Sequence, residues 1–434
     1  MKYIIILADG AADEPLDVFG GKTPLQAACK PNIDRIAREG INGRLVTVPE
    51  GYNPGSEIAH LGLLGYDVNK VFEGRGSLEA ASMQVPIEDQ EVAMRCNIIC
   101  IAPADGDDSS DISNWIIKNH SAGNISTAEA DELIKALNDE LAPRFNARLE
   151  AEGWPKDAVR WFTGVSYRHL LKVRGGDKHV TCTPPHDRIG KPWKNELPCV
   201  FLPGGARTSK LLRELIVASY DLLSKHPVNL KRVAEGKDPA NMIWPWSLGY
   251  RPKMQTLHEL FPDKIQTGAV ISAVDLIFGI GVYCGLKKVE VPGATGLWDT
   301  NYEGKTEAAL RELREKDFVF LHVEATDEAG HDGEPELKKQ CVEMLDSRCV
   351  KTILDEVSTW DEPVRVAILP DHPTPIRYRT HTMSPVPFAI WQNHAAADGG
   401  NIVADSVQSF DEDACFGGSL GLLEGDQFIC TLLK

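Results

Sequence analysis

The fold of this chain is indicated most clearly by the stretch Val364-Arg365-Val366-Ala367-Ile368-Leu369-Pro370-Asp371-His372-Pro373-Thr374-Pro375. Its first six residues are mostly apolar, which predicts a strand buried in a sheet. An Asp-His pair, a proline-rich turn and then His381 follow that strand. In open α/β sheets, ligands bind beyond the carboxyl ends of the strands. Asp371, His372 and His381 are ligand types for zinc- or manganese-class ions, although core histidines without any ligand are also common.

Two other apolar stretches lead into side chains of the same kinds. A strand over 3–8 is followed by Asp9, and a strand over 317–323 is followed by Asp327 and His331. Asp327 and His331 are four residues apart, so one helical turn would place them side by side, facing one ion. An ordinary capped helix start is the alternative for this pair.

Ser56 follows the turn residues Pro54 and Gly55 and opens a segment with helical spacing that ends near Gly65. A serine at the mouth of a helix can act as a nucleophile, and the free N–H groups there favour a phosphate. The alternative is that Ser56 only caps the helix.

The order of apolar stretches and helical patterns predicts an α/β fold with a mostly parallel sheet flanked by helices. Predicted strands span 3–8, 44–48, 265–271, 289–291, 317–323 and 364–369. Predicted helices span 31–38, 56–65, 273–284, a segment from 305, and 334–357.

Residues 71–245 contain basic and imidazole side chains but no second set of metal-ligand types. They are predicted to form an inserted α+β lid domain, with 1–70 and 246–434 forming the core. The predicted elements of the insertion are a strand over 92–102, an acidic loop over 105–113, a helix over 127–137, a strand pair over 161–172, a loop over 183–188 and a helix over 209–223. The tryptophan-rich segment 242–246 is expected to return the chain to the core. Arg75, Arg95 and Arg168 lie in this region, and each is as compatible with a solvated surface as with a site.

The chain has 434 residues and a net charge of −17, with 63 acidic and 46 basic side chains. This balance argues against nucleic acid or an anionic membrane as a partner, because both require a basic face. It leaves room for a small anionic substrate, since a metal and a few arginines can reverse the field locally. No apolar stretch approaches a membrane span, and the 10 scattered cysteines are typical of a reduced, cytoplasmic protein.

Together, Asp9, Ser56, Asp327, His331, Asp371, His372 and His381 come from four loops that a parallel sheet would gather at one edge. Seven such groups suit two metal ions, with Ser56 deprotonated beside them. Two ions a few ångströms apart stabilise the attacking and leaving oxygens of a phosphoryl transfer. The donor types suit manganese or zinc more than magnesium alone.

Over nearly its full length the chain resembles the cofactor-independent phosphoglycerate mutases, and within them the archaeal-type branch of the alkaline phosphatase superfamily. The motifs that carry the resemblance are Ala8-Asp9-Gly10, Asn53-Pro54-Gly55-Ser56-Glu57, Gly74-Arg75-Gly76, Arg95-Cys96-Asn97, Tyr167-Arg168-His169, Pro185-His186-Asp187, Val291-Pro292-Gly293-Ala294-Thr295-Gly296, Asp327-Glu328-Ala329-Gly330-His331 and Asp371-His372-Pro373-Thr374-Pro375.

The resemblance implies an alkaline-phosphatase-like core and assigns roles to individual residues. Ser56 would be the phosphorylated nucleophile. One metal would be held by Asp9, Ser56, Asp371 and His372, and the other by Asp327, His331 and His381. The lid would bind the substrate carboxylate and phosphate, and relay protons, through Arg75, Arg95, Asn97, Arg168, His169, His186 and Asp187. The two metals would be Mn²⁺ or Zn²⁺, with Mg²⁺ as a further option, and no bisphosphoglycerate would be needed.

The implied reaction is the interconversion of 3-phosphoglycerate and 2-phosphoglycerate through a phosphoserine. The core specifies transfer through serine, whereas the lid decides the acceptor, so a homoserine kinase-like phosphotransferase and a phosphomonoesterase remain alternatives. A non-catalytic metal-binding protein is the one alternative that is not an enzyme. The sequence leaves the oligomeric state open.

Overall fold

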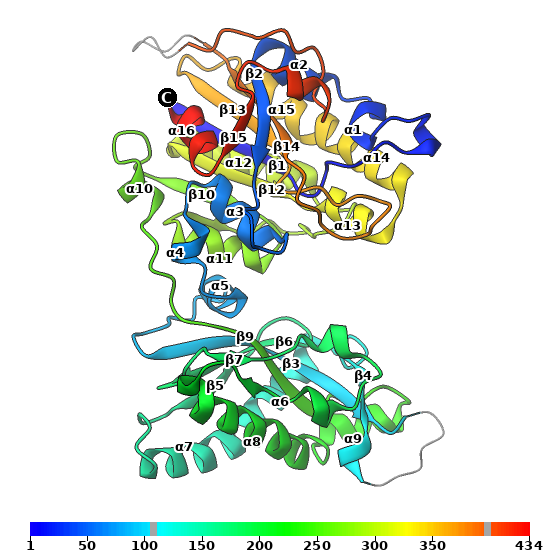
Figure 1. Cartoon of the computed structure of the whole chain (residues 1–434), viewed down its shortest axis with the longest axis vertical. Coiled ribbons are helices and arrows are strands. Elements are labelled where there is room, and N and C mark those ends of the chain that lie inside the picture. The colour runs from blue at the N-terminus through cyan, green and yellow to red at the C-terminus, as the bar shows by residue number, and fades with distance from the viewer. Residues whose placement is uncertain (105–110, 395–400) are drawn as a thin grey trace. The chain divides into compact units, whose positions relative to one another are not determined.

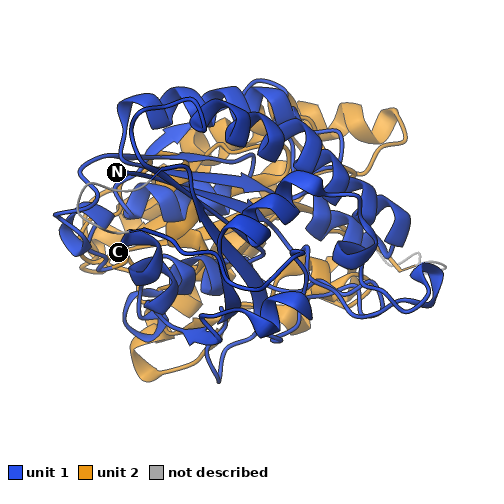
Figure 2. Cartoon of the chain, turned by 90° about the horizontal axis from the view of Figure 1, so that it is seen from above, with its two compact units in different colours: residues 1–72, 253–434 blue, residues 73–252 orange. Residues whose placement is uncertain are grey.

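The computed structural model describes residues 1–104, 111–394 and 401–434, and the chain divides into two compact units. Unit 1 comprises Met1–Phe72 and Lys253–Lys434, and unit 2 comprises Glu73–Pro252. Figure 2 colours the two units separately. Part of the acidic loop predicted over 105–113 lies outside the described residues. No helix of the described residues is long and apolar enough to cross a membrane.

Unit 1 is built on an eight-stranded sheet in the order β11-β10-β12-β1-β13-β14-β2-β15 (Figure 1). The strands are β1 (Lys2–Ala8), β2 (Ile41–Val46), β10 (Gly268–Ile271), β11 (Lys287–Val289), β12 (Phe318–Val323), β13 (Val364–Leu369), β14 (Val386–Gln392) and β15 (Leu422–Glu424). Strands β11, β10, β12, β1 and β13 run parallel, and β14 is antiparallel to both of its neighbours. The predicted mostly parallel sheet flanked by helices is confirmed.

Central strands β1, β12 and β13 are fully buried, as expected for parallel strands covered on both faces. Ile4 and Ile6 of β1 share one core cluster with residues of α2 (Pro31–Glu39), α12 (Tyr302–Glu315) and α15 (Lys351–Val357). The opposite face packs against α11 (Asp275–Tyr283) and α16 (Gln427–Leu433). A Cβ on Gly281 of α11 would lie 2.5 Å from Val270, and Phe428 of α16 stacks edge-on against Phe388.

The remaining α-helices of unit 1 lie in the connections between its strands. They are α1 (Pro24–Ala27), α3 (Ser56–Leu63), α4 (Val68–Val71), α10 (Leu257–Leu260), α13 (Ala325–Asp332) and α14 (Pro335–Met344). The helix predicted over 334–357 is interrupted, because residues 345–350 form a π-helical turn between α14 and α15. The strand predicted at 44–48 begins three residues earlier, at Ile41, where it pairs with β14.

Unit 2 has a mixed α+β organisation around an antiparallel sheet. Its strands are β3 (Glu91–Ala102), β4 (Ile116–Asn119), β5 (Val159–Phe162), β6 (Arg168–Arg174), β7 (Val180–Thr181), β8 (Cys199–Val200) and β9 (Met242–Gly249). Its helices are α5 (Arg75–Ser82), α6 (Thr127–Ala136), α7 (Ala142–Ala151), α8 (Ala206–Leu223) and α9 (Pro227–Ala234). The segment expected to return the chain to the core is instead strand β9, which pairs with β3 inside unit 2. Its apolar tryptophans are buried there, so the compact unit continues to Pro252.

Candidate active site

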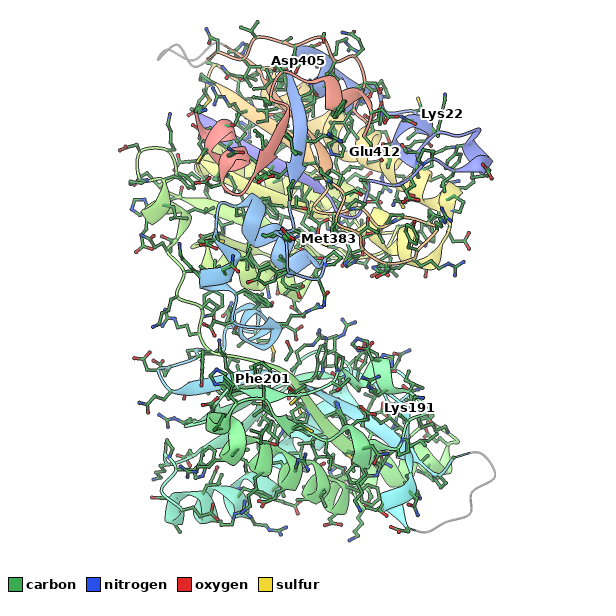
Figure 3. All side chains as sticks on the ribbon, in the orientation of Figure 1. Lys22, Lys191, Phe201, Met383, Asp405 and Glu412 are labelled. Carbon is green, nitrogen blue, oxygen red and sulfur yellow. The ribbon has the colours of Figure 1, made fainter. Side chains whose placement is uncertain are left out.

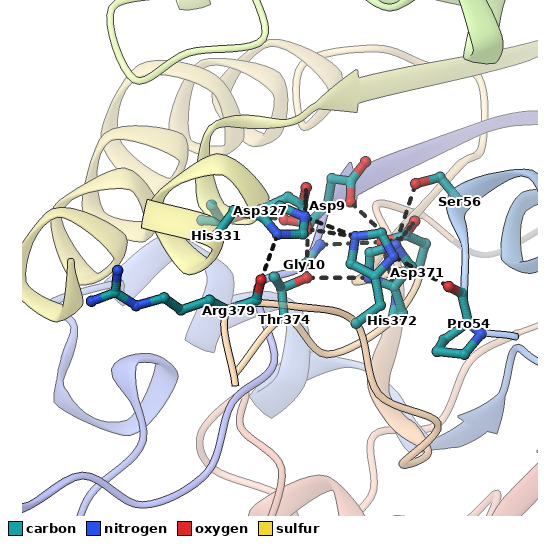
Figure 4. A network of polar contacts seen from close by, with 12 residues as sticks. Asp9, Gly10, Pro54, Ser56, Asp327, His331, Asp371, His372, Thr374 and Arg379 are labelled. Carbon is teal, nitrogen blue, oxygen red and sulfur yellow. Dashed lines mark hydrogen bonds and ion pairs between the residues drawn. The ribbon is translucent and has the colours of Figure 1, made fainter. Parts of the chain in front are cut away.

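Four loops at the carboxyl ends of the unit 1 strands bring seven predicted site residues into one cluster (Figure 4). Asp9 directly follows β1, and Asp371 and His372 follow β13 after one proline. Asp327 and His331 lie one turn apart on α13, which begins two residues after β12. The parallel register of β1 with β12 and β13 places these strand ends side by side.

Gly10 lets two of these loops approach each other. It has a φ of +62°, and a Cβ there would lie 2.5 Å from Asp327 Oδ1 and 2.7 Å from Asp327 Cα. Its backbone N–H donates to Asp371 Oδ1 at 3.1 Å. A side chain at position 10 would therefore both strain the backbone and separate the carboxylates.

The first group of donors consists of Asp327, His331 and His381. Nε2 of His331 lies 3.0 Å from Nε2 of His381 and 3.3 Å from Asp327 Oδ2, and Nε2 of His381 lies 3.5 Å from Asp327 Oδ1. The Nδ1 atoms face carbonyl oxygens, of Arg379 at 2.9 Å and of Pro54 at 3.4 Å. Carbonyls only accept, so each Nδ1 carries a hydrogen, and each Nε2 faces the group, where it can bind a proton or a cation.

These donor separations match a coordination shell. Four donors at about 2.0–2.1 Å from one ion are about 3.3 Å apart in a tetrahedron. Hydrogen bonding to Asp327 raises the pKa of His331 to about 9, which shows how strongly this group attracts positive charge. Burial alone would raise the pKa of Asp327, but the two histidines hold it well below its usual range.

The second group consists of Asp9, Ser56, Asp371 and His372. Nε2 of His372 lies 3.3 Å from Ser56 Oγ, 3.1 Å from Asp371 Oδ2 and 3.9 Å from Asp9 Oδ1. Both aspartates are buried, and neither Asp9 Oδ1 nor Asp371 Oδ2 has a hydrogen-bond partner among the described residues. Burial, and then the neighbouring Asp371 carboxylate, raise the pKa of Asp9 well above its usual value. Two buried carboxylate oxygens without a hydrogen bond fit a cation that no side chain supplies.

Ser56 is the first residue of α3 and not its cap. The N-cap position is Gly55, and no side chain caps the helix. The hydroxyl of Ser56 instead points toward His372 (Figure 4). The alternative that Ser56 serves only as a helix cap is therefore wrong. Its orientation leaves the hydroxyl free to act as a nucleophile or a ligand.

Unit 2 contains its own cluster of cationic and aromatic side chains. Arg95 on β3 pairs with Glu79 at 3.0 Å, and its guanidinium stacks 4.4 Å from the ring of Trp246 on β9. Asn97 accepts from Trp246 Nε1 at 3.0 Å and donates to the carbonyl of His120 at 3.1 Å. Burial lowers the pKa of Arg95, and the nearby Arg75 and Arg168 act in the same direction.

Other predicted substrate-binding residues lie around this cluster. His186 stacks edge-on against Trp246 at 5.5 Å and against His120 at 6.0 Å. Burial, and then Arg95 and Arg75, lower its pKa, while the exposed Asp187 opposes that shift. Several positive groups in one partly buried region are suited to binding an anion.

His169 occupies a different environment from the other predicted substrate-binding residues. It is buried, and its Nδ1 accepts the backbone N–H of Gly164 at 3.1 Å. Burial lowers its pKa to about 4, so the ring is neutral near pH 7. In this structure His169 holds the turn between β5 and β6.

Comparisons with known proteins identify the family. A family model described as 2,3-bisphosphoglycerate-independent phosphoglycerate mutase matches residues 37–229. A protein of that name from Methanosarcina acetivorans is 46% identical over 436 residues, covering 100% of both chains. This chain belongs to the 2,3-bisphosphoglycerate-independent phosphoglycerate mutases. The resemblance inferred from its motifs is confirmed.

Solved structures agree with membership of this mutase family. A protein from Pyrococcus horikoshii aligns with a TM-score of 0.77 at 27% identity, covering 99% of this chain and 96% of that one. A cofactor-independent phosphoglycerate mutase from Thermoplasma acidophilum aligns with a TM-score of 0.63 at 26% identity, covering 97% and 96% of the two chains.

Sequence reasoning about this mutase missed several residues of the two clusters. In unit 1 these are His60, which donates from Nδ1 to the Ser56 carbonyl at 2.7 Å, His322 beside Asp9, and Thr374, which donates to Asp327. In unit 2 they are His120 and Trp246. His60 stands four residues after Ser56 on one helix, and this spacing was an available signal. Thr374 stands two residues after His372 in the quoted motif, so its position was also a signal. The positions of His322, His120 and Trp246 depend on strand pairing and on contacts between segments far apart in the sequence, which no local pattern shows.

Proposed function

We propose that this protein interconverts 3-phosphoglycerate and 2-phosphoglycerate through a phosphoserine at Ser56, without bisphosphoglycerate. The observation that carries the proposal is the position of Ser56 Oγ, 3.3 Å from His372 Nε2 within the unit 1 donor cluster. The names of full-length relatives at 42–46% identity support the substrate. The core would then be alkaline-phosphatase-like, with unit 2 as the substrate-binding lid.

The donor groups suit two divalent cations, Mn²⁺ or Zn²⁺ by donor chemistry, with Mg²⁺ as a further option. Asp9, Ser56, Asp371 and His372 would hold one, and Asp327, His331 and His381 the other. Ligand atoms of Asp9, Asp371 and His372 lie within 4.8 Å of one another, and His331 Nε2 lies 3.3 Å from Asp327 Oδ2 and 3.0 Å from His381 Nε2. When bound, such ions lower the pKa of a serine hydroxyl and neutralise phosphate charge.

The chain's own residues account for the group transfer. Ser56 Oγ loses its proton and attacks phosphorus, the bond from phosphorus to O3 breaks, and O3 of glycerate takes up a proton. O2 of glycerate then loses its proton and attacks the phosphoserine, and Ser56 Oγ is released and protonated again. Arg75, Arg95 and Arg168 suit the substrate carboxylate and phosphate, because a guanidinium binds either group bidentately. Excluding water keeps the phosphoserine from being hydrolysed.

The test is isomerisation of 3-phosphoglycerate by the purified protein with Mn²⁺ and without bisphosphoglycerate, followed by phosphorus NMR. We expect turnover by wild type and by Ser347→Ala, which removes an exposed helix hydroxyl. Ser56→Ala should lose it, and acid-quenched wild type should carry phosphate on Ser56. Phosphorylation of homoserine from a phosphate donor, without isomerisation, would overturn the substrate assignment. Release of free phosphate as the main product would instead indicate a phosphomonoesterase.

A further inference from the structure

His322 is a buried histidine beside the catalytic cluster that belongs to neither donor group. It lies on β12, where the parallel register pairs it with Leu7 of β1, two residues before Asp9. Its Nε2 lies 2.7 Å from Asp9 Oδ2, and its Nδ1 lies 2.9 Å from the hydroxyl of Ser272, which follows β10. Three adjacent strands therefore meet in one chain of hydrogen bonds, through His322 on β12 and the residues directly after β10 and β1.

The hydrogen bonds of Ser272 determine which ring nitrogen of His322 carries the hydrogen. Ser272 Oγ accepts the backbone N–H of Val274 at 3.0 Å, and among the described residues His322 Nδ1, at 2.9 Å, is the partner that remains to accept its hydroxyl hydrogen. Nδ1 is then an acceptor, so Nε2 carries the ring hydrogen and donates it to Asp9 Oδ2. A doubly protonated ring would leave the buried hydroxyl of Ser272 without an acceptor.

The hydrogen bond from His322 to Asp9 Oδ2 also decides which way Asp9 Oδ1 faces. With Oδ2 engaged by His322, Oδ1 is the atom that faces His372 at 3.9 Å, and no described residue forms a hydrogen bond with it. Backbone contacts hold both residues in place, since Thr326 Oγ1 donates to the Asp9 carbonyl and Lys305 Nζ donates to the His322 carbonyl at 3.2 Å.

We propose that His322 is a positioning residue, oriented by Ser272, which sets the rotation of the Asp9 carboxylate so that Oδ1 is presented to the metal. Hydrogen bonds behind a metal ligand orient it and tune its affinity, typically by 10–100-fold. This inference rests on the proposed function, because it takes Asp9 as a metal ligand.

A third metal site is the competing interpretation of the same residues. Ligand atoms of Asp9, His60 and His322 lie within 4.8 Å of one another. In the assigned tautomer, however, His322 directs a hydrogen and not a lone pair toward Asp9, which argues against an ion between them. The chain of hydrogen bonds from Ser272 through His322 to Asp9, called the relay below, accounts for the contact of 2.7 Å between His322 Nε2 and Asp9 Oδ2 without any further ion.

The experiment measures Mn²⁺ affinity of the metal-free full-length protein by calorimetry, together with kcat and KM. We expect His322→Leu to weaken Mn²⁺ binding about 10–100-fold, with kcat partly restored by excess Mn²⁺. His322→Gln keeps an N–H donor and should bind closer to wild type, and Ser272→Ala should be intermediate. Phe318→Leu, a buried substitution at the other end of β12, serves as the packing control and should leave the affinity unchanged.

Each outcome separates the relay from the proposed function. Unchanged Mn²⁺ affinity in His322→Leu, or an equal loss in Phe318→Leu, would overturn the relay. Asp9→Asn tests the assignment beneath it. If Asp9→Asn weakens Mn²⁺ binding and His322→Leu does not, only the relay is wrong, whereas no effect of Asp9→Asn would overturn the metal assignment itself.

Should His322→Leu fail to fold, a loss of affinity in Ser272→Ala that His322→Gln does not share would support the relay, and wild-type affinity in Ser272→Ala would contradict it.

Discussion

Nε2 of His331 lies 3.0 Å from Nε2 of His381, and each ring directs its Nδ1 toward a backbone carbonyl. Two lone pairs held this close repel each other unless a cation or a proton lies between them. The contact therefore connects the fold directly to metal binding, because the carbonyls that orient the rings belong to the loops that carry the site.

Replacing one member of this pair should remove one metal. We expect His381→Ala to lower the bound Mn²⁺ from two ions to one per chain and to reduce kcat at least about 100-fold, since even residues behind a ligand contribute 10–100-fold. Metal analysis after gel filtration and the isomerisation assay check this. His394→Ala changes an exposed histidine and is the control. Two ions per chain in His381→Ala would contradict the assignment.

Gly10 offers a test of backbone geometry at the site. Gly10→Ala should destabilise the fold by more than the ~1–2 kcal/mol of a left-handed alanine, and should also abolish activity, because the new Cβ meets Asp327. Gly20 has almost the same φ, +65°, with no atom within 4 Å of an added Cβ. Gly20→Ala should therefore show the backbone strain with activity intact. Denaturant unfolding and turnover separate the two effects, and full activity in Gly10→Ala would refute this account.

Arg95 in unit 2 should act on substrate binding. Arg95→Met removes a guanidinium that stacks on Trp246, and we expect KM for 3-phosphoglycerate to rise about 10–100-fold, the range for a hydrogen bond to a charged group. Arg160→Met, an exposed arginine on β5, is the matched control. An unchanged KM in Arg95→Met, measured at saturating Mn²⁺, would exclude this arginine from the substrate site.

Glu412, which belongs to neither metal-binding group, should make the stability of the fold depend on pH (Figure 3). Burial raises its pKa to about 7, although its carboxylate accepts from Thr23 Oγ1 and the Asp13 N–H. The folded state then holds a proton that the unfolded chain releases near its ordinary value of 4.5. The contribution of this group is favourable at low pH and is lost as the pH rises from about 4.5 to about 7.

Glu412→Gln should remove that dependence. Relative to wild type, its free energy of unfolding should be nearly unchanged at pH 4 and higher by up to about 3 kcal/mol at pH 8, at about 1.4 kcal/mol per pKa unit. The neighbouring charges, Asp411 and the buried Asp13–Lys338 pair, are the same in both proteins. Urea unfolding at several pH values measures the difference, and a constant difference across that range would contradict the shifted pKa.

Local patterns in the sequence are enough to predict the parallel-sheet core and the kinds of side chain at its strand ends. Short, mostly apolar runs such as Phe318–Val323 indicate buried parallel strands, and polar residues that follow them are expected at the carboxyl edge of the sheet. That is why the residue pattern alone places Asp9, Asp327 and Asp371 in one cluster.

Which atoms face one another depends instead on tertiary contacts. The side chain of Ser56 turns to His372 and leaves the helix uncapped, His322 reaches Asp9 through the register of β1 and β12, and β9 pairs within unit 2. Register, ring tautomer and strand pairing arise from contacts between residues far apart in the chain, and their energies depend on neighbours that local patterns do not reveal. The chemistry at the strand ends was therefore predictable, whereas the hydrogen bonds that orient it were not.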